Sequence, residues 1–269
     1  MIEKAAGFRP DAFVPDLEDS VADADKSEAR RTVREQMGVL INTGIPVLPR
    51  INARDTGLAE EDLQSIVRPG VCGVSIGKVN TPDDVLWLSD VLSELESKQD
   101  MSAGTLGLVV WIETALGIVN CYEICRASER IWAVAFGAED FTHDMAIQRL
   151  EGDGNVDFAR NALCIAARAA GVLALDTPYF QFRDKEGLIK NAVASKHIGF
   201  KGKFAIHPAQ VDLINRVFSP TEDEIDYAAR VVAAYEEAES KGRGSTSLDG
   251  KVIDVPVYKR ARELLASRP

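Results

Sequence analysis

The chain has little with which to bind a polyanion or to cross a membrane. Its 269 residues carry a net charge of −11 and contain no apolar run of 18 or more residues. A sequence-independent contact with nucleic acid or with an anionic membrane requires clustered positive charge, so we expect neither partner. A membrane span requires a longer apolar run, and there is no basic-then-apolar leader. We therefore expect a cytoplasmic protein.

Cysteines are few, and several familiar catalytic motifs are absent. There is no phosphate-binding loop, no dinucleotide-binding fingerprint and no Ser-His-Asp order. Hydride transfer and nucleotide hydrolysis are thereby disfavoured, whereas metal-assisted chemistry on a substrate that bears a carboxylate remains. The cysteines lie in apolar segments without the tight spacing of metal ligands, which predicts reduced core thiols. They are Cys72, Cys121, Cys125 and Cys164.

Strand-like and helix-like segments alternate along most of the chain, which predicts an α/β fold with a parallel sheet. The expected strands are 11–16, 45–52, 71–78, 105–112, 131–136, 172–175 and 203–206. The expected helices between them are 26–40, 82–97, 116–127, 156–170 and 185–198. Such a sheet is completed either as an open doubly wound fold or as a closed eight-stranded barrel. Seven strands are one short of a closed barrel.

The last part of the chain has a different pattern. Helical periodicity covers 209–218 and then a second helix that ends near residue 240. Residues 241–246 have the composition of a flexible linker, and 255–266 predict a last short helix. We therefore expect a barrel domain over 1–218 and a helical arm with a lid segment over 219–269. The arm either packs on a neighbouring subunit or is a frayed tail.

Two buried strands are each followed by a carboxylate. Glu113 follows the apolar run 108–112, and Asp140 follows the run 132–136 after a short turn. Because the carboxyl ends of parallel strands form the active-site face of a barrel, we expect these carboxylates to share a divalent cation. Magnesium prefers hard oxygen ligands of this kind. The alternative is that both carboxylates cap the helices that follow them.

A second acidic group ends the first expected strand, and two basic residues end the next two. Asp16, Glu18 and Asp19 form the acidic group, which either orders water around the metal or only interacts with the dipole of the helix 26–40. Arg50 is suited to a bidentate contact with a substrate carboxylate, and Lys78 ends the following strand. Either cation can instead be a counter-ion to the acidic group.

Gly137 and His207 complete the set of residues at expected strand ends. Gly137 lets the backbone come close to a ligand, and we expect it to contact substrate together with Ala138. His207 ends the seventh expected strand, where a histidine is as often structural as catalytic. We assign it no role as a base.

Six motifs, taken in this order, resemble the citrate lyase β-subunit and malyl-CoA lyase group of the HpcH/HpaI aldolase superfamily. The likeness spans the whole chain, and no single motif is decisive. The motifs are Asp16-Leu-Glu-Asp-Ser-Val21, Arg50-Ile-Asn52, Trp111-Ile-Glu-Thr114, Gly137-Ala-Glu-Asp140, Gly202-Lys-Phe-Ala-Ile-His-Pro208 and Asp249-Gly-Lys-Val-Ile-Asp-Val-Pro256.

The resemblance implies a (β/α)8 barrel with Mg2+ held by Glu113 and Asp140 and with substrate oxygens bound by Arg50. It implies cleavage or formation of the carbon–carbon bond of a citryl-, malyl- or citramalyl-type CoA thioester, with acetyl-CoA or a relative and a keto acid as products. It further implies a homo-oligomer, a trimer or a multiple of one. In that assembly Asp254 lies over the active site of the adjacent subunit, where it gives or takes a proton at the enolate carbon.

One departure from the family pattern concerns the start of the chain. Family members begin with a strand of the Arg-Ser-x-Leu-Phe-Val-Pro-Gly type, which is absent here. We hypothesise that Met1 is an internal methionine and that about 20 to 30 residues, one strand with its loop, precede it in a typical barrel. A mature N-terminus at Met1, measured by mass spectrometry of the natively expressed protein, would contradict this. The departure supports one alternative, a catalytically weak or idle paralogue that serves as a complex subunit or is a truncated gene product. A separate alternative is a sister aldolase that cleaves free hydroxy-keto acids, against which the Asp254 segment argues.

Overall fold

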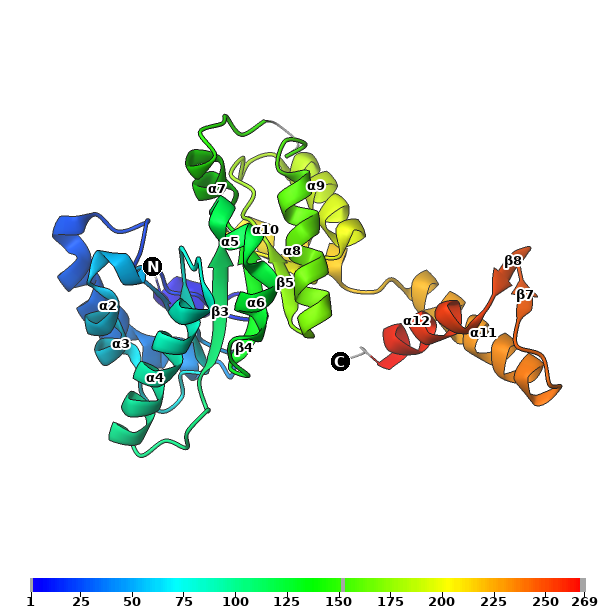
Figure 1. Ribbon diagram of the computed structural model, residues 1–269, viewed down its shortest axis with the longest axis horizontal. Helices are drawn as coiled ribbons and strands as arrows, with labels where there is room; N and C mark the ends of the chain where they lie inside the picture. The colour runs from blue at the N-terminus through cyan, green and yellow to red at the C-terminus, as the bar shows by residue number, and fades with distance from the viewer. Residues whose placement is uncertain (1, 151–152, 267–269) are drawn as a thin grey trace. The chain divides into compact units, whose positions relative to one another are not determined.

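The computed structural model describes residues 2–150 and 153–266 and divides into two compact units (Figure 1). The first unit is Met1–Phe218 and the second is Ser219–Pro269. Each unit has an apolar core of its own. None of the helices in the described part of the chain combines the length and the apolar character that crossing a membrane requires.

The first unit is built around a six-stranded parallel sheet in which the strands follow one another in chain order. The segment before β1 joins the same sheet through two parallel bridges, Phe13 to Val47 and Asp16 to Arg50. Within the described residues no pairing joins this segment to β6, so the sheet is open at that place. The strands are β1 Arg50–Ile51, β2 Gly73–Ile76, β3 Gly107–Ile112, β4 Ile131–Phe136, β5 Leu173–Asp176 and β6 Gly202–Lys203.

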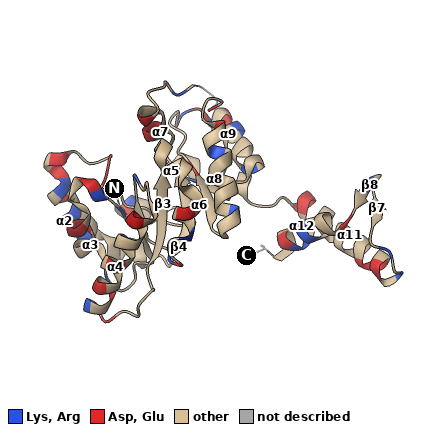
Figure 2. Ribbon diagram, in the orientation of Figure 1, with Lys and Arg blue, Asp and Glu red and all other residues tan. Residues whose placement is uncertain are grey.

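The chain order of the strands confirms the predicted α/β fold, and all seven expected strand positions take part in the sheet. β3 is buried along its whole length and β4 everywhere except at Trp132, which agrees with their continuous apolar sequences. Neither strand carries a charged residue, and Figure 2 shows charges of both signs spread over the helices. The expected strand 203–206 is shorter than predicted, since β6 ends at Lys203.

Helices of the first unit cover one face of the sheet and bury the larger apolar cluster. Alternate strand residues such as Val74, Val110 and Val134 belong to this cluster with Met37 of α2 and Leu163 of α8. The helices are α1 Ile2–Ala5, α2 Lys26–Ile41, α3 Ala59–Ile66, α4 Pro82–Lys98, α5 Ala115–Val119, α6 Cys121–Arg126, α7 Ala138–Asp144, α8 Asp157–Ala170, α9 Lys185–Ile198 and α10 Pro208–Phe218, with short 3-10 turns at Asp23–Asp25 and Arg54–Thr56.

The helix boundaries follow local signals in some places and tertiary contacts in others. α4 begins where Thr81 and Pro82 predict it, and the Thr81 N–H donates to the Asp84 carboxylate at 3.0 Å. The single helix expected over 116–127 is wrong, because the chain breaks into α5 and α6 at Asn120. The Asn120 side chain donates to the carbonyl of Asn80 at 2.9 Å, which holds the break in place. α3 and α7 were not expected.

The second unit contains two helices and a hairpin. They are α11 Glu222–Ser240, β7 Thr246–Leu248, β8 Lys251–Ile253 and α12 Val255–Ala266, with β7 and β8 antiparallel. Asp249 and Gly250 turn the hairpin with φ values of 51° and 76°, as a two-residue turn of this kind requires. The last residue of the predicted linker 241–246 is also the first residue of β7. All four cysteines are unpaired, as predicted, and three of them are buried.

Candidate active site

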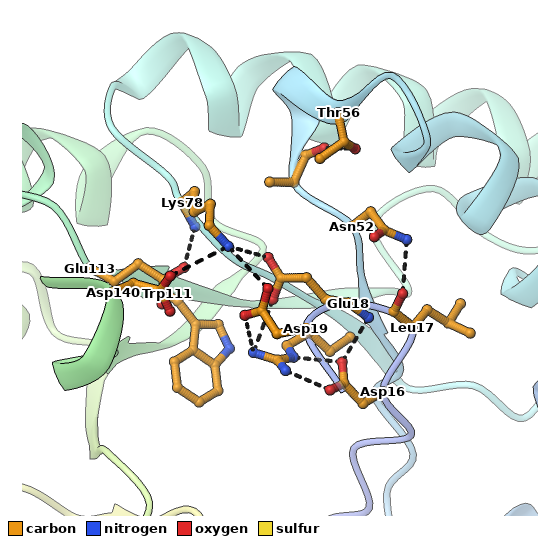
Figure 3. A network of polar contacts seen from close by, with 12 residues as sticks. Asp16, Leu17, Glu18, Asp19, Asn52, Thr56, Lys78, Trp111, Glu113 and Asp140 are labelled. Atoms are coloured by element: carbon orange, nitrogen blue, oxygen red, sulfur yellow. Dashed lines mark hydrogen bonds and ion pairs between the residues drawn. The ribbon is translucent and has the colours of Figure 1, made fainter. Parts of the chain in front are cut away.

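The carboxyl ends of four neighbouring strands gather the acidic and basic side chains that the sequence singles out (Figure 3). Arg50 lies in β1, Lys78 follows β2, Glu113 follows β3, and Asp140 lies in the first turn of α7 after β4. Parallel strands end at the same edge of a sheet, which brings these residues together. Residues 16–19 lie beside them, because Asp16 is bridged to Arg50.

Glu113 is a buried carboxylate, with a relative exposure of 1%. Its Oε1 atom accepts the backbone N–H of Lys78 at 2.7 Å. Burial, followed by the charges of Asp140 and Glu18, raises the pKa of Glu113 to about 8. The two glycines beside it are required for space: a Cβ on Gly77 would lie 2.8 Å from Oε1, and one on Gly137 would lie 2.1 Å from Oε2.

Asp140 is half-exposed and lies close enough to Glu113 for its charge to raise the pKa of that residue. Its Oδ1 atom is 3.8 Å from Nζ of Lys78. Glu113 does not cap the helix that follows it, because α5 is capped by Thr114, whose hydroxyl accepts the Gly117 N–H at 3.0 Å. Asp140 lies in the first turn of α7, where a carboxylate interacts favourably with the helix dipole, so the alternative stays open for Asp140. In the described part of the chain, the local contacts of the two carboxylates are the hydrogen bond from the Lys78 backbone to Glu113 and the ion pair of Asp140 with the Lys78 ammonium.

Arg50 is bound to the acidic group that precedes it. Its Nε and Nη2 atoms donate to the two oxygens of Asp16 at 2.7 and 2.5 Å, and Nη1 lies 2.9 Å from Oε2 of Glu18. Burial opposes the charged form, but the hydrogen bonds and charge of Asp16 outweigh it and raise the pKa of Arg50. The guanidinium also lies over the ring of Trp111, 5.5 Å from its centroid.

Lys78 lies among carboxylates from two different segments of the chain. Its ammonium is 3.0 Å from Glu18, 3.5 Å from Asp19 and 3.8 Å from Asp140. Burial opposes its charge, but Glu18 and the other carboxylates outweigh that effect and raise the pKa of Lys78. The backbone of Lys78 has a φ of 54°, which turns its N–H toward Glu113. The counter-ion alternative thus holds geometrically for both cations, and 31% of the Lys78 side chain is still exposed.

Glu18 joins the two cations. Burial raises the pKa of Glu18 although Arg50 and Lys78 oppose that shift. Its Oε2 atom is buried and makes no hydrogen bond in the described part of the chain, although it forms the ion pair with Arg50. The acidic group therefore faces the rim rather than only the start of α2.

The loop that carries Glu18 is held by residues that were not singled out by sequence reasoning. The buried ammonium of Lys26 donates to the carbonyls of Leu17 and Glu18 at 2.9 and 2.7 Å. The side chain of Asn52 donates to the same Leu17 carbonyl at 2.9 Å and to Asp62 at 2.6 Å. Asn52 belongs to the Arg50-Ile-Asn52 motif, whereas Lys26 has no sequence signal of its own.

The other expected site residues lie as follows. Ala138 is buried, and its N–H donates to the Thr177 hydroxyl at 3.3 Å. His207 stacks on Phe182 at 5.0 Å between ring centroids. Contact of substrate with Gly137 and Ala138 stays a prediction.

Asp254 belongs to the second unit and begins α12. Its Oδ1 atom accepts the Val257 N–H at 3.2 Å, and its backbone carbonyl accepts the Tyr258 N–H at 2.9 Å. The side chain is exposed. Its role as a proton donor or acceptor stays a prediction.

The charges at the rim are unbalanced, because five carboxylates face two cationic side chains. No group of three or more His, Cys, Asp or Glu side chains in residues 2–150 and 153–266 is arranged to hold a metal. Two carboxylates, Glu113 and Asp140, are nevertheless the usual protein contribution to a magnesium site, where water and substrate fill the other positions.

A parallel β/α barrel with paired carboxylates and an arginine at its carboxyl rim defines a class of barrels suited to binding small acids. The chain belongs to the HpcH/HpaI aldolase/citrate lyase family, whose model matches residues 1–208. It is 38% identical over 266 residues to the citrate lyase subunit beta of Escherichia coli strain K12, covering 99% of this chain and 88% of that protein.

Two further relatives extend the comparison. The mitochondrial citramalyl-CoA lyase of Rattus norvegicus is 31% identical over 274 residues, covering 98% of this chain and 81% of that protein. The crystal structure of CitE from Mycobacterium tuberculosis in complex with magnesium, acetoacetate and coenzyme A is 28% identical, with a TM-score of 0.74. That match covers 93% of this chain and 87% of the CitE chain. The predicted family and the predicted barrel-type fold are both confirmed.

Proposed function

We propose that the protein is a magnesium-dependent carbon–carbon lyase that acts on a CoA thioester of the citryl, malyl or citramalyl type. The products are acetyl-CoA, or a relative of it, and a keto acid. The observation that carries this proposal is the buried carboxylate of Glu113, whose pKa is raised to about 8 beside Asp140. The names of the E. coli and rat relatives, and the magnesium, acetoacetate and coenzyme A of the M. tuberculosis complex, support it.

The residues present fit a divalent cation. Glu113 has one backbone hydrogen bond and no cationic side chain in direct contact in the described residues, so the charge that it gains on losing its proton is left for a bound cation to compensate. Gly77 and Gly137 keep the space beside its two oxygens free of Cβ atoms. When bound, Mg2+ supplies Lewis-acid stabilisation of the negative charge on a chelating keto acid.

Arg50 is the residue that we propose for the substrate carboxylate. Nε and Nη2 donate to Asp16, and Nη1 forms ion pairs with Glu18 at 2.9 Å and Asp19 at 3.7 Å. A guanidinium has five N–H groups, which is more than these contacts with Asp16 require. Asp16 fixes the plane of the guanidinium, so its orientation is set before substrate binds. The charges around the proposed metal ligands are then set by four further side chains, which are Asp16, Glu18, Asp19 and Lys78.

Asp254 is the proposed proton donor or acceptor at the enolate carbon. We propose that it acts in the site of a neighbouring subunit, which requires a homo-oligomer, a trimer or a multiple of one. Light scattering coupled to size-exclusion chromatography tests the assembly, and a monomer contradicts this part.

A cytoplasmic location belongs to the same proposal, because all four cysteines are free thiols, as in a reducing compartment.

A panel of citryl-, malyl- and citramalyl-CoA, assayed with the matching free acids, tests the function. We expect magnesium-dependent cleavage of at least one thioester and none of the free acids. Cleavage of the free acids alone contradicts the thioester substrate and indicates a sister aldolase. If the folded protein cleaves none of these and shows no magnesium-dependent keto acid binding by calorimetry, the protein is an idle subunit.

A further inference from the structure

Asp144 is the last residue of α7, the helix that carries Asp140. Its Oδ2 atom accepts the backbone N–H of Ala115 at 2.7 Å. Ala115 is the first residue of α5 and lies two positions after Glu113. A hydrogen bond therefore joins the helix that bears one proposed metal ligand to the segment that bears the other.

The path from this bond to each of the two carboxylates is short. Asp140 and Asp144 are four positions apart on one face of a helix, about 6 Å along its axis. Glu113 and Ala115 are two positions apart, which is about 7 Å of chain at most. In the described part of the chain, no other hydrogen bond joins α7 to the segment 113–119. The bond is thus well placed to set the separation of the two carboxylates.

The position of Asp144 is unfavourable for its own helix. A carboxylate in the last turn of a helix lies at the negative end of the helix dipole, whereas the first N–H groups of a helix attract a carboxylate. The start of α5 already has a cap in Thr114, whose hydroxyl accepts the Gly117 N–H at 3.0 Å. Asp144 adds a second acceptor there, supplied by a different helix. The contact with α5, rather than any benefit to α7, explains a carboxylate at this position.

We propose that Asp144 is a positioning residue for the metal site, which holds Asp140 at the distance from Glu113 that suits Mg2+. The inference rests on the proposed function, in which these two carboxylates bind the ion. Mg2+ requires oxygen atoms at about 2.0 to 2.1 Å in nearly octahedral geometry, whereas Ca2+ accepts oxygen atoms at about 2.3 to 2.6 Å in flexible geometry. Loss of the Asp144 bond therefore weakens the binding of Mg2+ more than the binding of Ca2+.

The test is calorimetric titration of the full-length protein with Mg2+ and, separately, with Ca2+. Asp144→Ala removes the acceptor and is expected to weaken Mg2+ binding about 10-fold, as does the loss of other residues that orient metal ligands. Ca2+ binding is expected to weaken by about threefold or less. Asp144→Asn keeps an oxygen that can accept the Ala115 N–H and is expected to stay within about threefold of the wild type for both ions.

Asp184→Ala is the matched control. The exposed carboxylate of Asp184 also accepts a backbone N–H at the start of a helix, from Gly187 at 2.9 Å, but it begins α9, away from the two segments that bear the proposed ligands. This variant is expected to keep the wild-type affinity for both ions. Urea unfolding checks that each variant is folded.

The inference is overturned, and the proposed function stands, if the wild type binds Mg2+ and folded Asp144→Ala keeps that affinity or loses both ions equally. Losses of the same size in Asp144→Asn and Asp144→Ala also overturn it, because the charge and not the hydrogen bond would then matter. If the folded wild type binds no Mg2+, the proposed function and the inference both fail.

Discussion

A Cβ atom at Gly137 would lie 2.1 Å from Oε2 of Glu113, so the turn after β4 and the carboxylate after β3 fit together only because residue 137 is glycine. Gly137→Ala is therefore expected to displace Glu113 and to weaken Mg2+ binding about 10- to 100-fold. Calorimetric titration with Mg2+ measures this. The control is Gly38→Ala within α2, where a Cβ meets only a side-chain atom of Arg68 at 3.9 Å and the metal affinity should not change. Wild-type affinity in Gly137→Ala would contradict this account of the glycine.

The raised pKa of Glu113 predicts a pH dependence of stability in the metal-free protein. Between its ordinary pKa of 4.5 and about 8, the unfolded chain has lost this proton while the folded protein keeps it. The folded state then binds more protons, so the free energy of unfolding falls as the pH rises through this range, by a few kcal/mol at most. Urea unfolding at pH 5, 6, 7 and 8 measures the slope. Glu113→Gln is expected to be flatter, and an identical slope in that variant would refute the assignment.

Arg50→Lys tests whether keto acid binding depends on the positive charge of residue 50 alone or also on the fixed orientation of the guanidinium. The lysine keeps the positive charge but loses the paired hydrogen bonds to Asp16 and the fixed plane of the guanidinium. We expect keto acid binding to weaken about 10- to 100-fold, the cost of a charged hydrogen bond, while the Mg2+ affinity changes little. Calorimetry with each ligand in turn provides both values. A parallel loss of metal binding would show that Arg50 supports the metal site instead.

The stability of the first unit also depends on a buried ion cluster at the carboxyl ends of β5 and β6, the two strands that follow the four described above. Asp176 accepts from Lys203 at 2.6 Å, from Arg160 at 3.0 Å and from Ser195 at 2.6 Å, and it is fully buried. Asp176→Asn leaves two buried cations undercompensated and is expected to lower the free energy of unfolding by about 3 to 5 kcal/mol. Asp157→Asn removes an exposed partner of the same Arg160 and should cost less than about 1 kcal/mol. Equal losses in urea unfolding would contradict this contrast.

Sequence reasoning located the rim residues because the rule that governs them is simple: parallel strands end at one edge. Glu113 and Asp140 could be placed from the two apolar runs alone. The acidic group was one of two expected partners of Arg50, but its paired hydrogen bonds with Asp16 could not be predicted, because they span 34 positions and depend on the path of the loop. The positive φ of Lys78 could not be predicted either, because no local signal favours this backbone conformation for a lysine.

Two misses have different physical causes. The break at Asn120 comes from a tertiary hydrogen bond to the backbone of Asn80, which helical periodicity does not report. The β7–β8 hairpin had a usable signal in Asp249 and Gly250, but the composition of the preceding residues was read as a linker. The break at Asn120 could be predicted only with the fold known, whereas the hairpin could have been predicted from the sequence alone.

The central claim, that Glu113 and Asp140 jointly hold Mg2+, is tested most directly by one calorimetric titration. It compares Mg2+ binding to the wild-type protein with binding to Glu113→Gln, Asp140→Asn and Asp254→Ala. We predict that the first two variants lose measurable binding, whereas Asp254→Ala keeps the wild-type affinity and is impaired only in turnover. Equal Mg2+ affinity in all three variants would contradict the assignment of the ligands and the separate role of Asp254.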